Sequence, residues 1–427
     1  MFAYDVGEAF VRLGLAIDQH FPGYVDAYFG PEAIAQSVRG REKVPLAELE
    51  DQVQHLAAAV AHDETIVPRR REWLQGEVAA MRTTLRILQG GAPDILDEVR
   101  LLYGVTPAWV DESTFEEAHR ALDGILPGTG PVAERVSAFR QRLRVSLAAI
   151  LPDVKRLADE LRRRTCAGFA LPPEEACEFV FLRDKPWMAN NAYQGSGKSR
   201  IEINEDRPFH LHQLPELLAH EAYPGHHTEL AIKEQSLYQE EGWLEQAIVL
   251  SNTPTSLVSE GMAMNALRVI AEPEETVGFY GELLGAAGLP VGEASRVAAF
   301  VSAARPLNRV SDNQILLLHG EKVPEEEVVA YGVRNGMNTE EEERQLLRFY
   351  RDPLWRSYGF NYTIGRDLVE QYLSVREDRV KAFATLLSEP VTPRQLDLAA
   401  DTQATCAHAG MGGSGAIPRE GTPRRGG

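Results

Sequence analysis

The chain has 427 residues, a formal net charge of −19 and 44% hydrophobic residues. This composition can bury a sizeable core, so wholesale disorder is excluded. The acidic excess disfavours nucleic acid and anionic membranes as partners, and no apolar run approaches the ~20 residues of a spanning helix. Three widely spaced cysteines and the lack of a basic-then-apolar leader fit a reducing cytoplasm. We therefore expect a soluble cytoplasmic protein, whose oligomeric state the sequence leaves open.

Helical periodicity dominates the N-terminal part of the chain. Amphipathic helices are expected over 46–65 and 69–89, and a capping box at Ser113 predicts a third helix that ends near residue 126. One long helical stretch is expected over 131–164. Its proline, Pro152, should kink or split it, because proline removes a backbone donor and clashes with the preceding turn.

The pattern changes near residue 174. Short strands are predicted over 177–182 and 200–204, with a polar, glycine-rich loop over 190–197 between them. After residue 208 the helical periodicity resumes. Helices are expected over 213–223, 227–238, 254–272, 274–287, 291–318, 325–335, 339–350 and 360–388. The sequence therefore predicts a mainly α fold with a small β-sheet.

The most unusual segment is 217–227, which reads LLAHEAYPGHH. Zinc hydrolases need two imidazoles close together and a glutamate that handles a proton of the water on the metal. A regular helix supplies this arrangement with histidines at positions i and i+4, which share a face. Four residues after His220, however, stands Pro224, so the plain motif is absent.

The Pro-Gly pair after this helix offers another route to the same geometry. Pro224 cannot continue the hydrogen bonding of the helix, and Gly225 tolerates backbone angles that other residues avoid. A local bulge that loops two residues out of the helix would place His226 at the position of the second ligand. Placing His227 there would require three residues to be looped out. We favour His226 as the ligand, keep His227 as the alternative, and otherwise expect His227 beside the ligands or the substrate.

Glu260 is the expected third ligand. It lies in a predicted helix on the same face as Leu257, Met264 and Leu267. An ionised carboxylate that faces a core is costly unless a cation or hydrogen-bond donors meet it. A metal ion would provide that cation. The alternative is a structural cluster of histidines that binds no metal.

Three motifs carry a resemblance to a known family: HEAYPGHH at 220–227, EGMA at 260–263 and YTIG at 362–365. They resemble the bacterial family catalogued as domain of unknown function 885, which is grouped with the gluzincin-like metallopeptidases. The resemblance implies a large helical gluzincin-like fold and zinc as the cofactor. The implied zinc ligands are His220, His226 or His227, and Glu260.

The same resemblance implies roles for residues beside the metal. Glu221 would be the general base, and Tyr362 a candidate donor to the developing oxyanion, with His227 as a further catalytic candidate. Glu229 and Met262 depart from the family pattern, which usually has Gln and Trp at these positions.

The leading prediction is a zinc-dependent hydrolase, a metallopeptidase that cleaves short peptides through a zinc-bound water activated by Glu221. One alternative is an inactive homologue that binds metal or peptide, and another is a zinc amidohydrolase with a non-peptide substrate. We expect an N-terminal helical region over 1–170, packed as one unit with a catalytic region over 171–400. A disordered tail is expected over 401–427.

Other patterns in the chain are weaker. The segment 192–199 nearly matches a phosphate-binding loop, but an alternating strand follows it instead of a helix, so a hairpin is expected. Its exposed strand edge could add an extended peptide, or the hairpin could be a plain connection. Asn190 and Asn191 would offer donors near the site. Arg305 and Arg309 could clamp a substrate carboxylate or form internal ion pairs.

Overall fold

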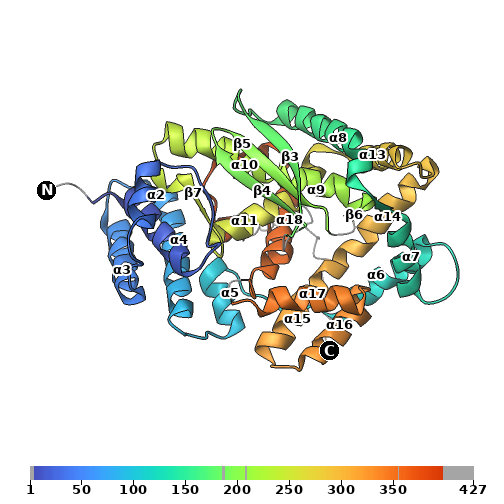
Figure 1. The fold of residues 1–427 in the computed structure, drawn as a ribbon, viewed down its shortest axis with the longest axis horizontal. Helices are drawn as coiled ribbons and strands as arrows, with labels where there is room; N and C mark the ends of the chain where they lie inside the picture. Colours follow the sequence, from blue (N-terminus) through green and yellow to red (C-terminus); the bar gives the residue numbers. More distant parts are fainter. Residues whose placement is uncertain (1–3, 185–187, 207–208, 354, 398–427) are drawn as a thin grey trace, which may run out of the picture.

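The computed structural model describes residues 4–184, 188–206, 209–353 and 355–397. Within these residues the fold is mainly helical with small β-sheets, which confirms the predicted fold class (Figure 1). The predicted tail over 401–427 lies outside the described residues. No helix in the described part of the chain is long and apolar enough to span a membrane.

The N-terminal helices form one end of the molecule in Figure 1. They are α1 (Val6–His20), α2 (Glu32–Arg39), α3 (Leu46–His62), α4 (Pro68–Leu88) and α5 (Ile95–Tyr103). The structure confirms the helices predicted over 46–65 and 69–89, although the first ends three residues early. Pro68 opens α4 at its first position, where its missing N–H costs no intrahelical bond.

The next three helices depart from the prediction in detail. They are α6 (Glu112–Ile125), α7 (Val132–Arg142) and α8 (Leu147–Gly168). The carboxylate of Asp111, not Ser113, caps α6. The stretch over 131–164 is broken before α8, where strand β2 (Arg144–Val145) pairs with β6 (Phe209–His210), while Pro152 stays inside α8. Pairing with a distant strand, which local periodicity does not encode, decides the break.

The main sheet has the strand order β3–β5–β4. Its strands are β3 (Ala176–Leu182), β4 (Ala189–Gly195) and β5 (Lys198–Asn204). β3 runs parallel to β5, and β4 forms an antiparallel hairpin with β5. The hairpin turn is Ser196-Gly197, with φ of 56° and 66°, as a tight two-residue hairpin requires. The segment 190–197, expected as a loop, is therefore mostly strand. The hairpin predicted for 192–199, in place of a phosphate-binding loop, is confirmed.

A further two-stranded sheet was not predicted. β1 (Val25–Tyr28) pairs with β7 (Ile248–Leu250), so a strand of the N-terminal region joins the segment that leads into the Glu260 helix. The register shifts between Val25 and Ala27, which makes Asp26 the extra residue of a β-bulge. Both strands are short and flanked by helical sequence, which explains why no alternating pattern revealed them.

The C-terminal half of the chain is a series of short helical segments. Those before residue 290 are η1 (Leu211–Gln213), α9 (Leu214–Glu221), α10 (His226–Lys233), η2 (Glu234–Glu240), η3 (Leu244–Ala247), α11 (Pro254–Ala263), α12 (Ala266–Ile270) and α13 (Pro273–Ala286). The later segments are η4 (Val291–Glu293), α14 (Ala294–Ala304), η5 (Arg305–Arg309), α15 (Val310–Ile315), η6 (Leu316–Gly320), α16 (Glu325–Gly336), α17 (Glu340–Arg351), η7 (Asn361–Gly365), α18 (Arg366–Ser374) and α19 (Arg379–Ser388). The helices expected over 254–272, 291–318 and 360–388 are thus each interrupted.

The buried cores cross the predicted boundary at residue 170. Leu122 of α6 shares a core with Leu218 of α9, and Leu85 of α4 shares another with Ile248 of β7. The fully buried carboxylate of Glu245 also pairs with Arg70 of α4 at 2.6 Å. These contacts join the two halves, while the division of the chain into regions stays a prediction.

Candidate metal centre

The turn between α9 and α10 brings two histidines together. α9 ends at Glu221 and α10 begins at His226, with a cis peptide bond before Pro224. At Gly225 the backbone passes so close to α9 that a Cβ atom would lie 1.9 Å from the carbonyl oxygen of His220. Only glycine fits there. This close approach allows α10 to start with the imidazole of His226 against that of His220.

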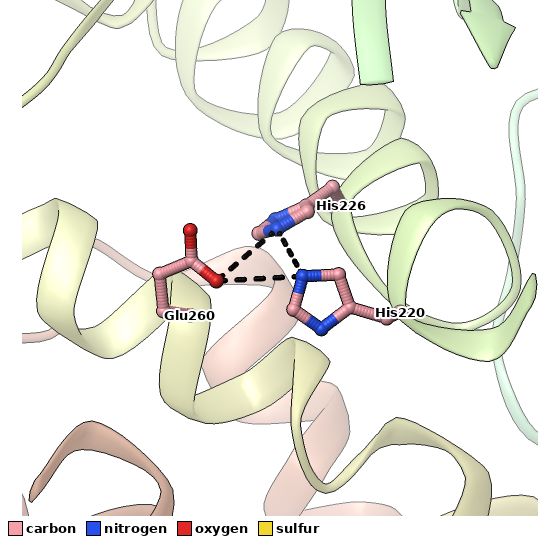
Figure 2. A group of neighbouring side chains, drawn as sticks. All are labelled: His220, His226 and Glu260. Carbon is pink, nitrogen blue, oxygen red and sulfur yellow. Dashed lines mark hydrogen bonds and ion pairs between the residues drawn. The ribbon is translucent and has the colours of Figure 1, made fainter. Parts of the chain in front are cut away.

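Helix α11 supplies the third member of the group. Its N-terminus is fixed by Thr253, which caps the helix, and by Glu77 of α4, which accepts hydrogen bonds from the N–H and hydroxyl of Thr255. Glu260 lies in the second half of α11 and is only 6% exposed. Its carboxylate points toward the two imidazoles (Figure 2).

The three ligand atoms have the spacing of a metal site. Nε2 of His220 and Nε2 of His226 lie 3.2 Å apart, and Oε2 of Glu260 lies 3.4 Å and 3.7 Å from them. Two zinc bonds of about 2.0–2.1 Å at a tetrahedral angle place their ligand atoms ~3.3–3.4 Å apart. These residues could therefore hold a tetrahedral ion that keeps one position free.

The electrostatics of the group call for a cation. Oε1 of Glu260 accepts a hydrogen bond from the hydroxyl of Tyr358 at 2.9 Å, but the buried Oε2 has no hydrogen-bond partner. Although burial lowers the pKa of His226, the carboxylate of Glu260 raises that pKa to about 9. The pair thus attracts positive charge, either a proton or a metal ion. A buried acceptor without a donor, facing two imidazoles, fits a metal ion.

A chain of hydrogen bonds orients His226 from behind. Its Nδ1 lies 3.2 Å from Oγ of Ser259, which donates to the carboxylate of Glu229 at 2.5 Å. Lys233, one helical turn after Glu229, donates to the same carboxylate at 2.6 Å. Such partners fix the orientation of a ligating imidazole and raise its basicity. Sequence reasoning missed Ser259 and Lys233, although Ser259 precedes Glu260 and Lys233 follows Glu229 by four residues.

Glu221 is placed at the wall of the same site. It is 7% exposed, and its backbone carbonyl accepts a hydrogen bond from the Asn191 side chain of β4 at 2.7 Å. Burial raises the pKa of the Glu221 carboxyl, while His220 and His226 oppose this shift. The structure thus places Asn191 near the site, as expected. Asn190 is its neighbour in β4, and successive strand residues point to opposite faces.

Tyr362 lies over the metal group. Its ring is roughly parallel to that of His220, with centroids 6.4 Å apart, and the ring of Tyr358 packs edge-on against it at 5.7 Å. Its surroundings and the charge of Glu260 raise the pKa of Tyr362 well above the usual value, so the phenol keeps its proton. Sequence reasoning missed Tyr358, because one of several tyrosines in an aromatic segment carries no distinguishing pattern.

His227 is not brought to the group. Its Nδ1 lies 2.9 Å from Oγ of Ser199 and its Nε2 lies 2.8 Å from the carboxylate of Glu175, and the side chain is fully buried. Tyr223 and Arg162 donate to the same carboxylate. Both ring nitrogens of His227 therefore have partners within the protein. The expected position of His227 beside the ligands or the substrate does not agree with this geometry.

Asp26, which no sequence pattern indicated, lies near the group. Its side chain is exposed and occupies the bulge of β1. The charges of His226, Glu260 and Glu221 act on the pKa of Asp26, which places this carboxyl group near theirs. A bulge beside a functional site commonly re-aims one side chain.

The arginines expected as a substrate clamp have internal partners. Arg309 pairs with Asp312 and with Asp367, each at 3.1 Å. Arg305 pairs with Glu370 at 3.3 Å. The structural alternative for both arginines therefore agrees with their contacts, and neither offers a free guanidinium fork to a substrate carboxylate.

Comparisons with known proteins give information about the fold alone. No family model matches the chain, and a search among curated proteins gives no match. A crystal structure of a candidate lipoprotein from Colwellia psychrerythraea is similar, with a TM-score of 0.51 and 16% identity over 94% of this chain and 75% of that one. At this identity the similarity concerns the architecture.

Proposed function

We propose that the protein is a zinc-dependent hydrolase of amide bonds, a metallopeptidase of the gluzincin-like type. The observation that carries the proposal is Oε2 of Glu260, a buried acceptor without a donor, 3.4 Å and 3.7 Å from the Nε2 atoms of His220 and His226. Two imidazoles and one carboxylate are a ligand set typical of catalytic zinc. The resemblance of three sequence motifs supports the same class.

The neighbouring side chains suit hydrolysis of a carbonyl compound. A zinc ion held by the three ligands would supply Lewis-acid activation of water and of the substrate carbonyl. Glu221, whose pKa burial raises, would take the proton of the attacking water and return it to the leaving amine. The phenol of Tyr362 would donate a hydrogen bond to the carbonyl oxygen as negative charge develops on it.

The edge of the main sheet favours a peptide as the substrate. Among the described strands β4 is hydrogen-bonded to a partner strand on one side only, and Asn191 of this strand contacts Glu221. Oδ1 of Asn191 is buried and has no hydrogen-bond partner. An extended peptide could pair with this edge and bring its amide bonds to the metal group.

Metal content tests the proposal first. The purified protein, incubated with zinc and dialysed, is expected to contain about one zinc ion per chain by elemental analysis. His220→Ala should lose it. His62→Ala, which removes an exposed histidine of α3, should retain it and serves as the matched control. Equal zinc in all three proteins, or zinc in none, would overturn the proposal.

Turnover then separates the alternatives. Glu221→Gln should lower the rate of peptide hydrolysis by about 10³-fold, within the range of general-base catalysis, and should keep the zinc. A zinc protein that hydrolyses no peptide but cleaves other amides would be an amidohydrolase with a non-peptide substrate. A zinc protein without any turnover would be the inactive binding homologue.

A further inference from the structure

An apolar recess opens beside the metal group. Its volume is about 270 Å³, and its walls come from η5, α15, α17 and η7, from Met264 directly after α11 and from Gly359 before η7. The side chains that give it its character are Met264, Leu346, Phe349, Tyr350 and Tyr362. Leu346, Phe349 and Tyr362 are 36–37% exposed, which is unusual for large apolar or aromatic side chains in this molecule. The recess is thus open to solvent and lined by apolar groups.

Two of the lining residues connect the recess to the metal group. Met264 follows Glu260 by four residues, and its N–H donates to the carbonyl of Glu260 at 2.9 Å. Residues at this spacing lie on one helix face, about 5–6 Å apart. Tyr362 contributes to the recess and also lies over the ring of His220. Tyr362 therefore lies between the recess and the metal group.

Two hydroxyls that line the recess offer no free donor to a ligand. The hydroxyl of Ser311 donates to the carbonyl of Asn308 at 2.8 Å. The hydroxyl of Thr363 donates to the carboxylate of Asp312 at 2.6 Å. Because these hydroxyl donors are already used within the protein, a polar group placed here would lose its hydration without compensation. The recess therefore selects apolar groups.

We propose that this recess is the subsite for a large apolar or aromatic side chain on a substrate residue next to the cleaved bond. The inference rests on the proposed hydrolase function and names its substrate class. A volume of about 270 Å³ exceeds the ~150 Å³ of a cavity that takes up benzene. A phenylalanine or leucine side chain fits, while an alanine side chain leaves the recess mostly unfilled.

Matched substrates test the inference. Peptide amides that differ only in Phe, Leu, Ala or Glu next to the cleaved bond should give kcat/KM values that fall in that order, with Phe at least about tenfold above Ala. Leu346→Glu should abolish most of this preference. Gln345→Glu adds the same charge one residue away, outside the lining, and should behave as the wild type.

A binding measurement separates this inference from the proposed function. Calorimetric titration of the zinc-loaded protein compares acetohydroxamate with 3-phenylpropanohydroxamate, which share the metal-binding group and differ in the benzyl group. The benzyl compound should bind at least about tenfold more tightly to the wild type but not to Leu346→Glu. This result would support the subsite even if every peptide resisted cleavage.

Two outcomes would overturn the inference. One is hydrolysis of peptides without any preference for the apolar side chain, together with equal binding of the two hydroxamates. The other is a change of the oligomeric state with Leu346→Glu in analytical ultracentrifugation, from an oligomer to a monomer. That change would show that a second copy of the chain covers the recess.

Discussion

His226 and His227 are neighbours in the sequence, yet they belong to clusters of opposite construction. Around His227 both ring nitrogens are bonded, to Ser199 and Glu175, and Glu175 accepts further bonds from Tyr223 and Arg162. Around His226 the carboxylate of Glu260 keeps one buried oxygen that makes no hydrogen bond, with the two imidazoles 3.4 Å and 3.7 Å away. The first cluster is complete as folded, whereas the second is complete only with a cation.

The same residue types thus form one cluster whose hydrogen bonds are complete and one in which a carboxylate oxygen has none. Buried polar groups are normally satisfied, so an unsatisfied group facing two imidazoles indicates a ligand. The cluster around His227 ties β5, the segment before β3 and the turn before α10 together. It therefore holds in place the turn that presents His226 to His220.

The largest difference in zinc affinity is expected between two variants, each with a Glu→Gln substitution in one of the two clusters. Glu260→Gln removes the charge that attracts the cation and should weaken zinc binding by about 10³-fold, which is ~4 kcal/mol. Glu175→Gln should leave the zinc content unchanged. Zinc titration monitored by a competing chromophoric chelator measures both, and loss of zinc in both variants to the same extent would remove the contrast.

Stability should respond in the opposite way. In zinc-free protein, Glu175→Gln should lower the free energy of unfolding by about 3 kcal/mol, because it breaks a buried, multiply bonded ion pair. Burial opposes the shift, but hydrogen bonds from His227 and Tyr223 hold the pKa of Glu175 below its ordinary value. This stabilisation is therefore present at neutral pH and lost on acidification.

Urea denaturation at pH 7 and at pH 4 measures this difference. Glu260→Gln, which removes a carboxylate that accepts a hydrogen bond from Tyr358 but has one oxygen without such a bond, should lower the stability of the zinc-free protein by less than Glu175→Gln does. A larger loss of stability for Glu260→Gln than for Glu175→Gln would contradict the comparison.

Glu77 is a third buried carboxylate, and here burial outweighs the hydrogen bonds in setting the pKa. Burial raises its pKa from 4.5 to about 7, although hydrogen bonds from Thr255 oppose the shift. As the pH rises from about 4.5 to about 7, the unfolded chain ionises before the folded one, so stability should fall by up to ~3 kcal/mol. Glu77→Gln should flatten this slope in urea denaturation series across that pH range. An unchanged slope would show that Glu77 ionises normally in the fold.

The smallest effect on zinc affinity is expected from Ser259, which contacts the far side of the His226 ring. Ser259→Ala breaks the link between His226 and Glu229 and should weaken zinc binding by about tenfold, as the loss of such partners commonly does. Ser295→Ala removes an exposed hydroxyl on α14 and should change nothing. Zinc affinity equal to the wild type in Ser259→Ala would mean that Glu229 does not orient His226.

The sequence revealed the residues of the site better than their surroundings. The HEAYPGHH segment identified His220 and His226 because Pro224 and Gly225 limit how the chain can continue, and local chain geometry is readable from sequence. Glu260 was identified by its place on an apolar helix face. Each of these signals lies within about three helical turns of chain.

Features that depend on distant contacts were not predictable. Asp26 reaches the site through the pairing of β1 with β7, which joins segments more than 200 residues apart. Tyr358 donates to Glu260 across 98 residues of chain. The break before α8 likewise arises from the pairing of β2 with β6. Periodicity describes one segment at a time, so it cannot show such partners.

The crossing of α11 with η7 has a consequence for how this protein can change. A Cβ on Gly261 would lie 2.2 Å from the carbonyl oxygen of Gly365, and one on Gly365 would lie 2.3 Å from that of Leu257. The two segments thus touch through their backbones, one residue after Glu260 and three after Tyr362. The exposed side chains of α17 can vary without moving this contact. Substitutions in the recess would therefore leave the backbone frame of the candidate metal group unaltered.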